Sequence, residues 1–158
     1  MKILKTDAGM LTDFEVLDML RARGAQRDPM ACIGLVANSE CKVYDYLLQR
    51  AACNQTREVI ESFKRRYEEF KKGNEKRKLT KAELLNIINF RPSSHAELYA
   101  VIPNLDARFK VNEDGGSNDV DELLNIVHEM LPPPPQQPEQ EAPDHEEGTQ
   151  NAEAMEQN

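Results

Sequence analysis

The chain has 158 residues, a formal net charge of −8 and 39% hydrophobic side chains, a composition that suits one domain with a core of moderate size. No apolar run approaches the ~20 residues of a membrane-spanning helix, and the N-terminal residues lack the long apolar stretch of a secretory signal. Three cysteines without a C-x-x-C pair favour free thiols over disulfides or a zinc site, so we expect a soluble intracellular protein.

The first predicted helix begins after Thr12, which is spaced to form a capping box with Glu15. Leu11 and Val16 have the spacing of a hydrophobic staple across the same helix start, and Gly24 is placed to end the helix. One apolar face carries Phe14, Leu17 and Leu20. This face suits two roles, docking onto another protein or packing onto its own domain, and the pattern alone favours neither.

The next segments are a connector and two helices. Residues 25–38 lack a regular pattern and predict the connector. We expect Ser39 to cap a helix that runs to Ala51, and Thr56 to start another that ends near Gly73. The apolar stripe of this second helix consists of Val59, Ile60, Phe63, Tyr67 and Phe70.

The fourth predicted helix repeats the start of the first one. Thr80 and Glu83 have the spacing of a capping box, and Leu79 and Leu84 that of a staple. The helix is expected to end at Arg91, because a residue that precedes proline is disfavoured in the helical region. Its inward residues are predicted to be Leu85, Ile87 and Ile88.

Shorter helical patterns complete the body. Ser94 and Glu97 have the spacing of a third capping box, and Asn104 is expected to cap a further turn. A last amphipathic helix follows the acidic loop 112–118. The apolar residues of these three segments are Leu98 and Val101, then Leu105 and Phe109, and finally Val120, Leu123, Leu124, Val127 and Leu131.

The C-terminal segment 132–158 begins with four prolines and contains seven carboxylates but no lysine or arginine. The preceding residues 1–131 are therefore close to neutral. Almost no aliphatic residue follows Leu131, so we predict a disordered tail. The sequence thus predicts an all-α fold in three parts: an N-terminal helix with its connector (1–38), a helical domain (39–131) and the acidic tail (132–158).

Catalytic chemistry has no support in the sequence. His95, His128 and His145 lack the spacing of metal ligands, and no phosphate-binding glycine motif or serine-nucleophile motif is present. We therefore predict no catalytic residues, no cofactor, no metal site and no nucleotide binding.

The segment 57–81 is the most basic part of the chain, with ten basic and five acidic residues. It suits either an RNA-binding surface or a solvated helix face with intrahelical ion pairs. The solvated face is favoured, because the interleaved aromatic residues also fit the core stripe. The candidate RNA contacts are Lys71, Lys72, Lys76, Arg77 and Lys78.

Several segments together resemble the small stalk subunit of RNA polymerases. They include "LTDFEVLDMLR", "KLTKAELLNIINFRPSSHAELYAVIP" and "VDELLNIVHEMLP", and the resemblance covers roughly residues 8–131. It is strongest to the RNA polymerase III version, the family of the CGRP-receptor component protein, and weaker to the versions in RNA polymerase II and in archaeal RNA polymerase. The most specific residues are Leu79, Thr80, Lys81, Glu83, Leu85, Ile87, Asn89, Arg91 and Pro92.

This resemblance implies an HRDC-like helical domain preceded by a segment that clasps an OB-fold stalk subunit. We expect a non-catalytic, nuclear subunit of DNA-directed RNA polymerase III that acts in transcription initiation and contacts the polymerase core and initiation factors, with nascent RNA as a further candidate contact. The alternatives are a free-standing HRDC-like nucleic-acid-binding module, the stalk subunit of another RNA polymerase, or an accessory protein at a membrane receptor. The resemblance assigns partner binding to Leu11, Phe14, Val16, Leu17 and Leu20.

Overall fold

The computed structural model describes residues 9–27, 36–109 and 118–136, and every regular element in these ranges is helical. The all-α prediction is confirmed. None of the described helices has the length and apolar character required for crossing a bilayer. The elements are α1 (Asp13–Ala22), α2 (Asn38–Leu48), the 3₁₀ turn η1 (Ala51–Cys53), α3 (Arg57–Phe70), the 3₁₀ turn η2 (Glu75–Arg77), α4 (Lys81–Phe90), α5 (His95–Val101), α6 (Leu105–Arg108) and α7 (Asp119–Met130).

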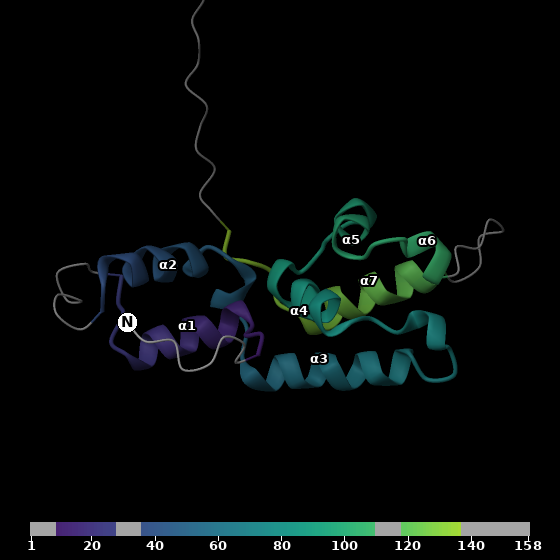
Figure 1. Ribbon diagram of the computed structural model, residues 1–158, viewed down its shortest axis with the longest axis horizontal. Coiled ribbons are helices and arrows are strands. Elements are labelled where there is room, and N and C mark those ends of the chain that lie inside the picture. The colour runs from purple at the N-terminus through teal and green to yellow at the C-terminus, as the bar shows by residue number, and fades with distance from the viewer. Residues whose placement is uncertain (1–8, 28–35, 110–117, 137–158) are drawn as a thin grey trace, which may run out of the picture.

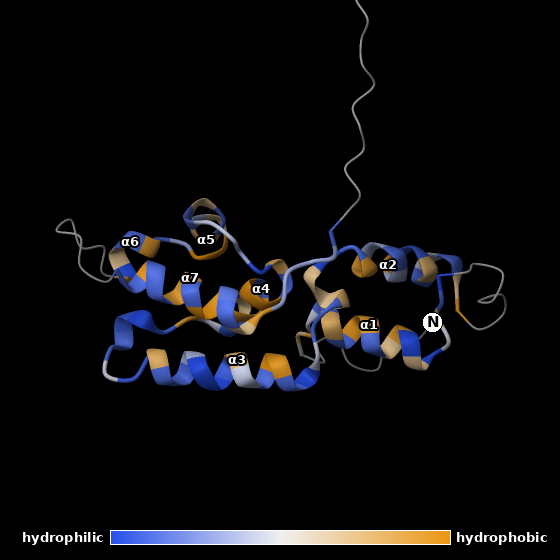
Figure 2. Cartoon of the chain, turned by 180° about the vertical axis from the view of Figure 1, so that it is seen from behind, coloured by the Kyte–Doolittle hydropathy of each residue, from blue (hydrophilic) through white to orange (hydrophobic). Residues whose placement is uncertain are grey.

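The helices form an elongated arrangement, with α1 and α2 at one end and α3 to α7 at the other (Figure 1). α1 packs against α2 and η1, and α3 packs against α7. The buried side chains from α1 to the end of α7 nevertheless form a single hydrophobic cluster. Hydrophobic and hydrophilic residues alternate along α3 (Figure 2). The predicted boundary at residue 38 falls at the first residue of α2, a helix that packs against α1.

The start and end of α1 follow their predicted chemistry. The Thr12 hydroxyl accepts a hydrogen bond from the Glu15 N–H at 3.2 Å, and the Glu15 carboxylate accepts one from the Thr12 N–H at 2.7 Å. At the other end Gly24 has a φ of 94°, and its N–H and that of Ala25 bond back to the last turn, as in a Schellman motif. The staple prediction is wrong in one respect, because Leu11 is 56% exposed.

The predicted bounds of the second helix are wrong at both ends. α2 begins at Asn38, so its N-cap is Ala37 and Ser39 lies inside the first turn. Alanine has no capping group, and the Glu40 carboxylate instead accepts a hydrogen bond from the Ala37 N–H at 2.8 Å. α2 ends at Leu48, and the chain then tightens into η1, which buries Ala51. The predicted start and apolar stripe of α3 are confirmed, except that Val59 is only partly buried.

The motif N-x-R-P at the end of α4 makes contacts that the sequence does not reveal. The Asn89 side chain accepts a hydrogen bond from the Asp13 N–H at 3.0 Å, which satisfies a donor at the start of α1. Arg91 ends the helix as predicted, but with a left-handed φ of 46°. Its Nε donates to the Leu131 carbonyl at 2.7 Å. The motif therefore joins α4 to α1 and to the end of α7.

Two predicted caps differ in the structure. Ser94 caps α5, but the Glu97 carboxylate accepts from the N–H and hydroxyl of Ser93, one residue earlier than a capping box requires. Asn104 precedes α6 with a left-handed φ of 53° and makes no side-chain capping bond. Among the predicted inward residues Leu85, Val101 and Leu124 are only partly buried. The predictions for the acidic loop, most of the connector and the tail beyond residue 136 concern residues outside the described ranges.

Candidate partner-binding surface

Two exposed apolar residues precede α1. Met10 is 55% and Leu11 56% exposed, although both are large and hydrophobic. Exposed apolar residues next to a concave surface are typical of a protein-binding site. A pocket of about 560 Å³ lies beside them, lined by Gly9, Met10, Thr12, Glu15, Lys64, Lys81, Leu84, Leu85 and Ile88.

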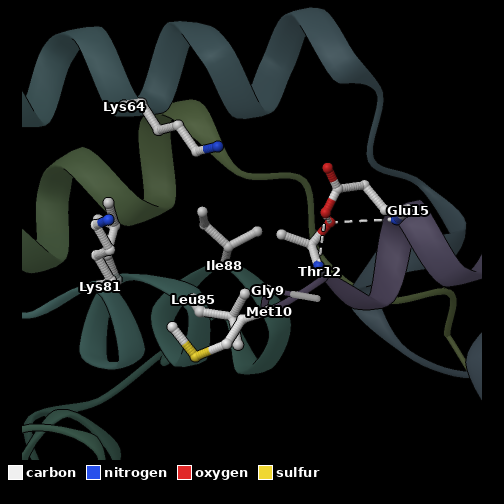
Figure 3. Close-up of a pocket in the computed structure, with 9 residues that line it drawn as sticks. Gly9, Met10, Thr12, Glu15, Lys64, Lys81, Leu85 and Ile88 are labelled. Atoms are coloured by element: carbon white, nitrogen blue, oxygen red, sulfur yellow. Dashed lines mark hydrogen bonds between the residues drawn. The ribbon is translucent and has the colours of Figure 1, made fainter. Parts of the chain in front are cut away.

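The pocket is built by three segments that are distant in the sequence. The residues before α1 contribute Met10 and α3 contributes Lys64, while α4 supplies Lys81 and the aliphatic residues, including Leu85 (Figure 3). The helical spacing of Leu84, Leu85 and Ile88 places them on neighbouring positions of one helix. The lining therefore combines aliphatic side chains with two lysines.

The charge of the pocket is predominantly positive. Thr12 holds the carboxylate of Glu15 with two hydrogen bonds, at 2.7 and 3.0 Å. The backbone hydrogen bond from Thr12 lowers the pKa of Glu15, and the charges of Lys64 and Arg57 lower it further. Neither Lys64 nor Lys81 forms an ion pair with a carboxylate of the described residues. An apolar segment that carries a carboxylate is therefore the complementary ligand.

The residues expected to bind a partner divide into two groups. Phe14, Leu17 and Leu20 are buried in this chain's own core, with exposed fractions of 8%, 0% and 2%. Of the two roles open to this face, the structure shows packing onto its own domain. Leu11 is exposed and Val16 is partly buried. Four residues of this surface are not among the predicted site residues: Met10, Lys64, Lys81 and Leu84. One signal for Met10 is visible in the sequence, because two adjacent apolar residues precede the Thr12 cap and a hydrophobic staple uses only one.

The candidate RNA contacts also divide. The ammonium of Lys71 pairs with Glu68 at 2.6 Å and lies 5.7 Å from the centre of the Tyr67 ring. A solvated helix face, the alternative to an RNA-binding surface, predicts ion pairs of this kind between side chains three or four residues apart. The exposed members of the set are Lys72, Lys76 and Lys78.

Arg77 is a structural residue. Its guanidinium pairs with Asp119 at 2.6 Å, donates to the Phe70 carbonyl at 3.0 Å and lies 4.7 Å from the centre of the Phe70 ring. Asp119 is 4% exposed. The ion pair therefore fixes η2 to the start of α7, and the Arg77 side chain is not directed at an external phosphate.

The described residues hold no group of three or more histidine, cysteine or acidic side chains that suits a metal ion. Within the same ranges His95 contacts Asp121 at 2.6 Å, and both side chains are about half exposed. This surface pair links α5 to α7 and lies in neither the pocket lining nor a buried cleft.

Comparison with known proteins identifies the family. A search of curated proteins finds no match. The family pattern described as RNA polymerase Rpb4 matches residues 10–131, which span all the described helices and the pocket apart from Gly9. The match covers more than half of the chain, including both L-T-x-x-E helix starts and the N-x-R-P motif. The chain therefore belongs to the RNA polymerase Rpb4 family, whose members are accessory stalk subunits of RNA polymerase.

Proposed function

We propose that the chain is a non-catalytic subunit of the nuclear DNA-directed RNA polymerase III, where it forms the stalk heterodimer with an OB-fold subunit and acts in transcription initiation. The family match over residues 10–131 carries the general role. The assignment to polymerase III rests on resemblance alone, taken over roughly residues 8–131. The helices after residue 38 are taken as the HRDC-like domain of this subunit.

The proposed contact with the OB-fold subunit is the surface formed by Met10, Leu11 and the pocket between α1, α3 and α4. Both residues are more than half exposed in the chain alone, so their burial on association would contribute favourable free energy. The lysines at the pocket rim would select a partner segment with a carboxylate next to its apolar residues. Phe14, Leu17 and Leu20 then act indirectly, because their burial positions this surface.

Replacing Met10 and Leu11 together with glutamate should weaken association with the OB-fold subunit by about tenfold or more. The reason is the loss of apolar contacts and the introduction of two charges into the interface. Stability of the chain alone should change little, because both side chains are exposed. Association is measured by co-purification of tagged full-length chain and by titration with the OB-fold subunit.

The matched control is Val43→Glu, which places a charge on an exposed apolar position of α2 that does not line the pocket. Equal affinity of the double variant and the native chain would contradict the proposed contact surface. Recovery of the subunits of a different polymerase with the tagged native chain would refute the assignment to polymerase III. Failure of the native chain to bind any OB-fold stalk subunit would refute the heterodimer itself.

We further propose that Lys72, Lys76 and Lys78 carry the RNA contact of the basic segment. Reversing these three charges to glutamate should weaken RNA binding by about tenfold or more at low salt and reduce its salt dependence. The fold should be retained because the three side chains are exposed. Electrophoretic mobility shift of labelled single-stranded RNA provides the measurement.

A variant with the same change in charge elsewhere serves as the control, with glutamate at Arg21, Arg27 and Lys42, all of which are exposed. Equal losses in both variants would show a general effect of net charge and would exclude a localised RNA site. Tight RNA binding by the chain alone, with no affinity for an OB-fold subunit, would instead favour the free-standing nucleic-acid-binding module.

A further inference from the structure

A second surface, separate from the lining of the partner pocket, presents an arginine close to two exposed aromatic rings. The guanidinium of Arg50 lies 5.2 Å from the centre of the Tyr46 ring and 5.7 Å from that of Phe90. Tyr46 is 54% and Phe90 55% exposed. Contact with two rings restricts the guanidinium and reduces the entropy lost when it binds an anion.

This cluster adjoins a groove of about 490 Å³ between η1, the end of α4 and α5, lined by Arg50, Phe90, Pro92, Glu97, Ala100 and Val101. Glu97 is the one carboxylate in this lining, and it already accepts two hydrogen bonds from Ser93. No ion pair joins Arg50 to a carboxylate of the described residues, although the Arg50 charge partly offsets the desolvation that raises the pKa of Asp13. The groove thus combines apolar walls with a cation that has room for an acidic ligand.

The C-terminal segment leaves the body close to this groove. The Asn54 side chain donates a hydrogen bond to the Pro133 carbonyl at 2.8 Å. Asn54 and Arg50 flank the single turn of η1, so their Cα atoms are about 8 Å apart at the 3₁₀ rise. The segment that leads to residue 136 passes between α2 and α4 (Figure 1).

Residues 137–158 carry seven carboxylates and no lysine or arginine. Glu139 is the first of them, six positions after Pro133, a span of up to about 20 Å. That reach exceeds the distance to Arg50 along η1. A covalently linked ligand so near its site has an effective concentration in the millimolar range. The bound state is therefore populated even when the affinity of the contact is weak.

We propose that the acidic segment 137–158 docks in this groove, with its carboxylates against Arg50 and its backbone over the rings of Tyr46 and Phe90. The docked segment covers an otherwise exposed aromatic and cationic surface. It acts there as an intramolecular competitor, so an external acidic ligand must displace it. This inference does not depend on the identity of the stalk partner.

The test compares ¹⁵N-resolved NMR spectra of the native full-length chain and of a full-length variant whose first five tail carboxylates are neutralised. The substitutions are Glu139→Gln, Glu141→Gln, Asp144→Asn, Glu146→Gln and Glu147→Gln. The Arg50 Nε–H signal and the Phe90 amide signal should differ between the two chains. A synthetic peptide of residues 137–158, added to the neutralised chain, should return both signals toward their native positions.

Arg50→Gln in the neutralised chain should weaken peptide binding by about tenfold, whereas Arg65→Gln at an exposed position of α3 should leave it unchanged. Identical Arg50 and Phe90 signals in the native and neutralised chains would overturn the proposal. So would peptide-induced shifts confined to α3. A shift that depends on protein concentration instead of tail charge would show that a second copy covers the groove, and would overturn it equally.

Discussion

Replacing Leu17 with alanine is expected to lower the free energy of unfolding of the chain alone by about 2–5 kcal/mol. Leu17 has no exposed surface, and it lies in the core that α1 shares with α2 and η1. The substitution removes buried methyl groups and leaves a cavity that the neighbouring helices fill only in part. Urea denaturation followed by circular dichroism measures the loss directly.

Met19→Ala provides the control on the same helix, because Met19 is 45% exposed. Its effect should stay within about 0.5–1 kcal/mol. If Leu17→Ala left the stability of the chain alone unchanged, α1 would be ordered only on its partner, as the docking role of the first helix requires. The expected loss would show that α1 belongs to the folded body before any partner binds.

Helix starts can be predicted from the sequence because their chemistry is local. The threonine hydroxyl accepts a hydrogen bond from the backbone N–H of a glutamate three residues later, and the glutamate carboxylate accepts one from the threonine N–H. Both bonds lie within four residues of chain. The predicted boxes at Thr12 and Thr80 are accordingly confirmed. The predicted cap at Ser39 is wrong because serine also fits inside a first turn, and Glu40 supplies the bond to the Ala37 N–H.

Periodicity predicts which side chains of α1 are buried but does not identify what buries them. An apolar face has the same pattern whether its neighbour is the same chain or another one. The pocket is also beyond the reach of periodicity, because Met10, Lys64 and Leu85 come from segments more than 20 residues apart in the sequence and meet only through the tertiary fold. The sequence gives only one local indication of this surface, the two adjacent apolar residues Met10 and Leu11 before α1.

The contacts of the most specific motif have the same limitation. Asn89 and Arg91 bond to α1 and to the end of α7, at sequence separations of 76 and 40 residues. Resemblance selects these residues without giving a reason for them. The structure supplies the reason: each satisfies a backbone group that a helix end leaves without an intrahelical partner.

Replacing Arg108 with methionine is expected to destabilise the chain by about 2–4 kcal/mol, near the lower end for a disrupted buried ion pair. The guanidinium bonds both carboxylate oxygens of Glu83, at 2.6 and 3.1 Å, and the Lys78 carbonyl at 2.5 Å. Methionine retains much of the side-chain volume but leaves the charge of Glu83, which is 8% exposed, without its partner. Urea denaturation of the variant measures the loss.

An exposed ion pair gives the comparison. Arg66 and Glu69 are 3.5 Å apart with both side chains about half exposed, so Arg66→Met should cost no more than about 1 kcal/mol. Equal costs at the two sites would contradict a structural role for the Arg108 bridge. A double-mutant cycle that adds Glu83→Gln should show coupling, because the second substitution removes the unpaired charge.

The pH dependence of the same bridge separates charge from packing. Burial alone would raise the pKa of Glu83, but hydrogen bonds from Arg108 and Thr80 lower it below the usual value of 4.5. A carboxyl whose pKa is lower in the folded chain contributes its full stabilisation above the pKa of the unfolded chain, and loses it as the pH falls through the folded value. The difference in stability between the native chain and Glu83→Gln should therefore be largest at about pH 6 to 7 and shrink below about pH 4.5. A difference that stays constant down to about pH 3 would mean that Glu83 contributes through packing and capping geometry instead of through its charge.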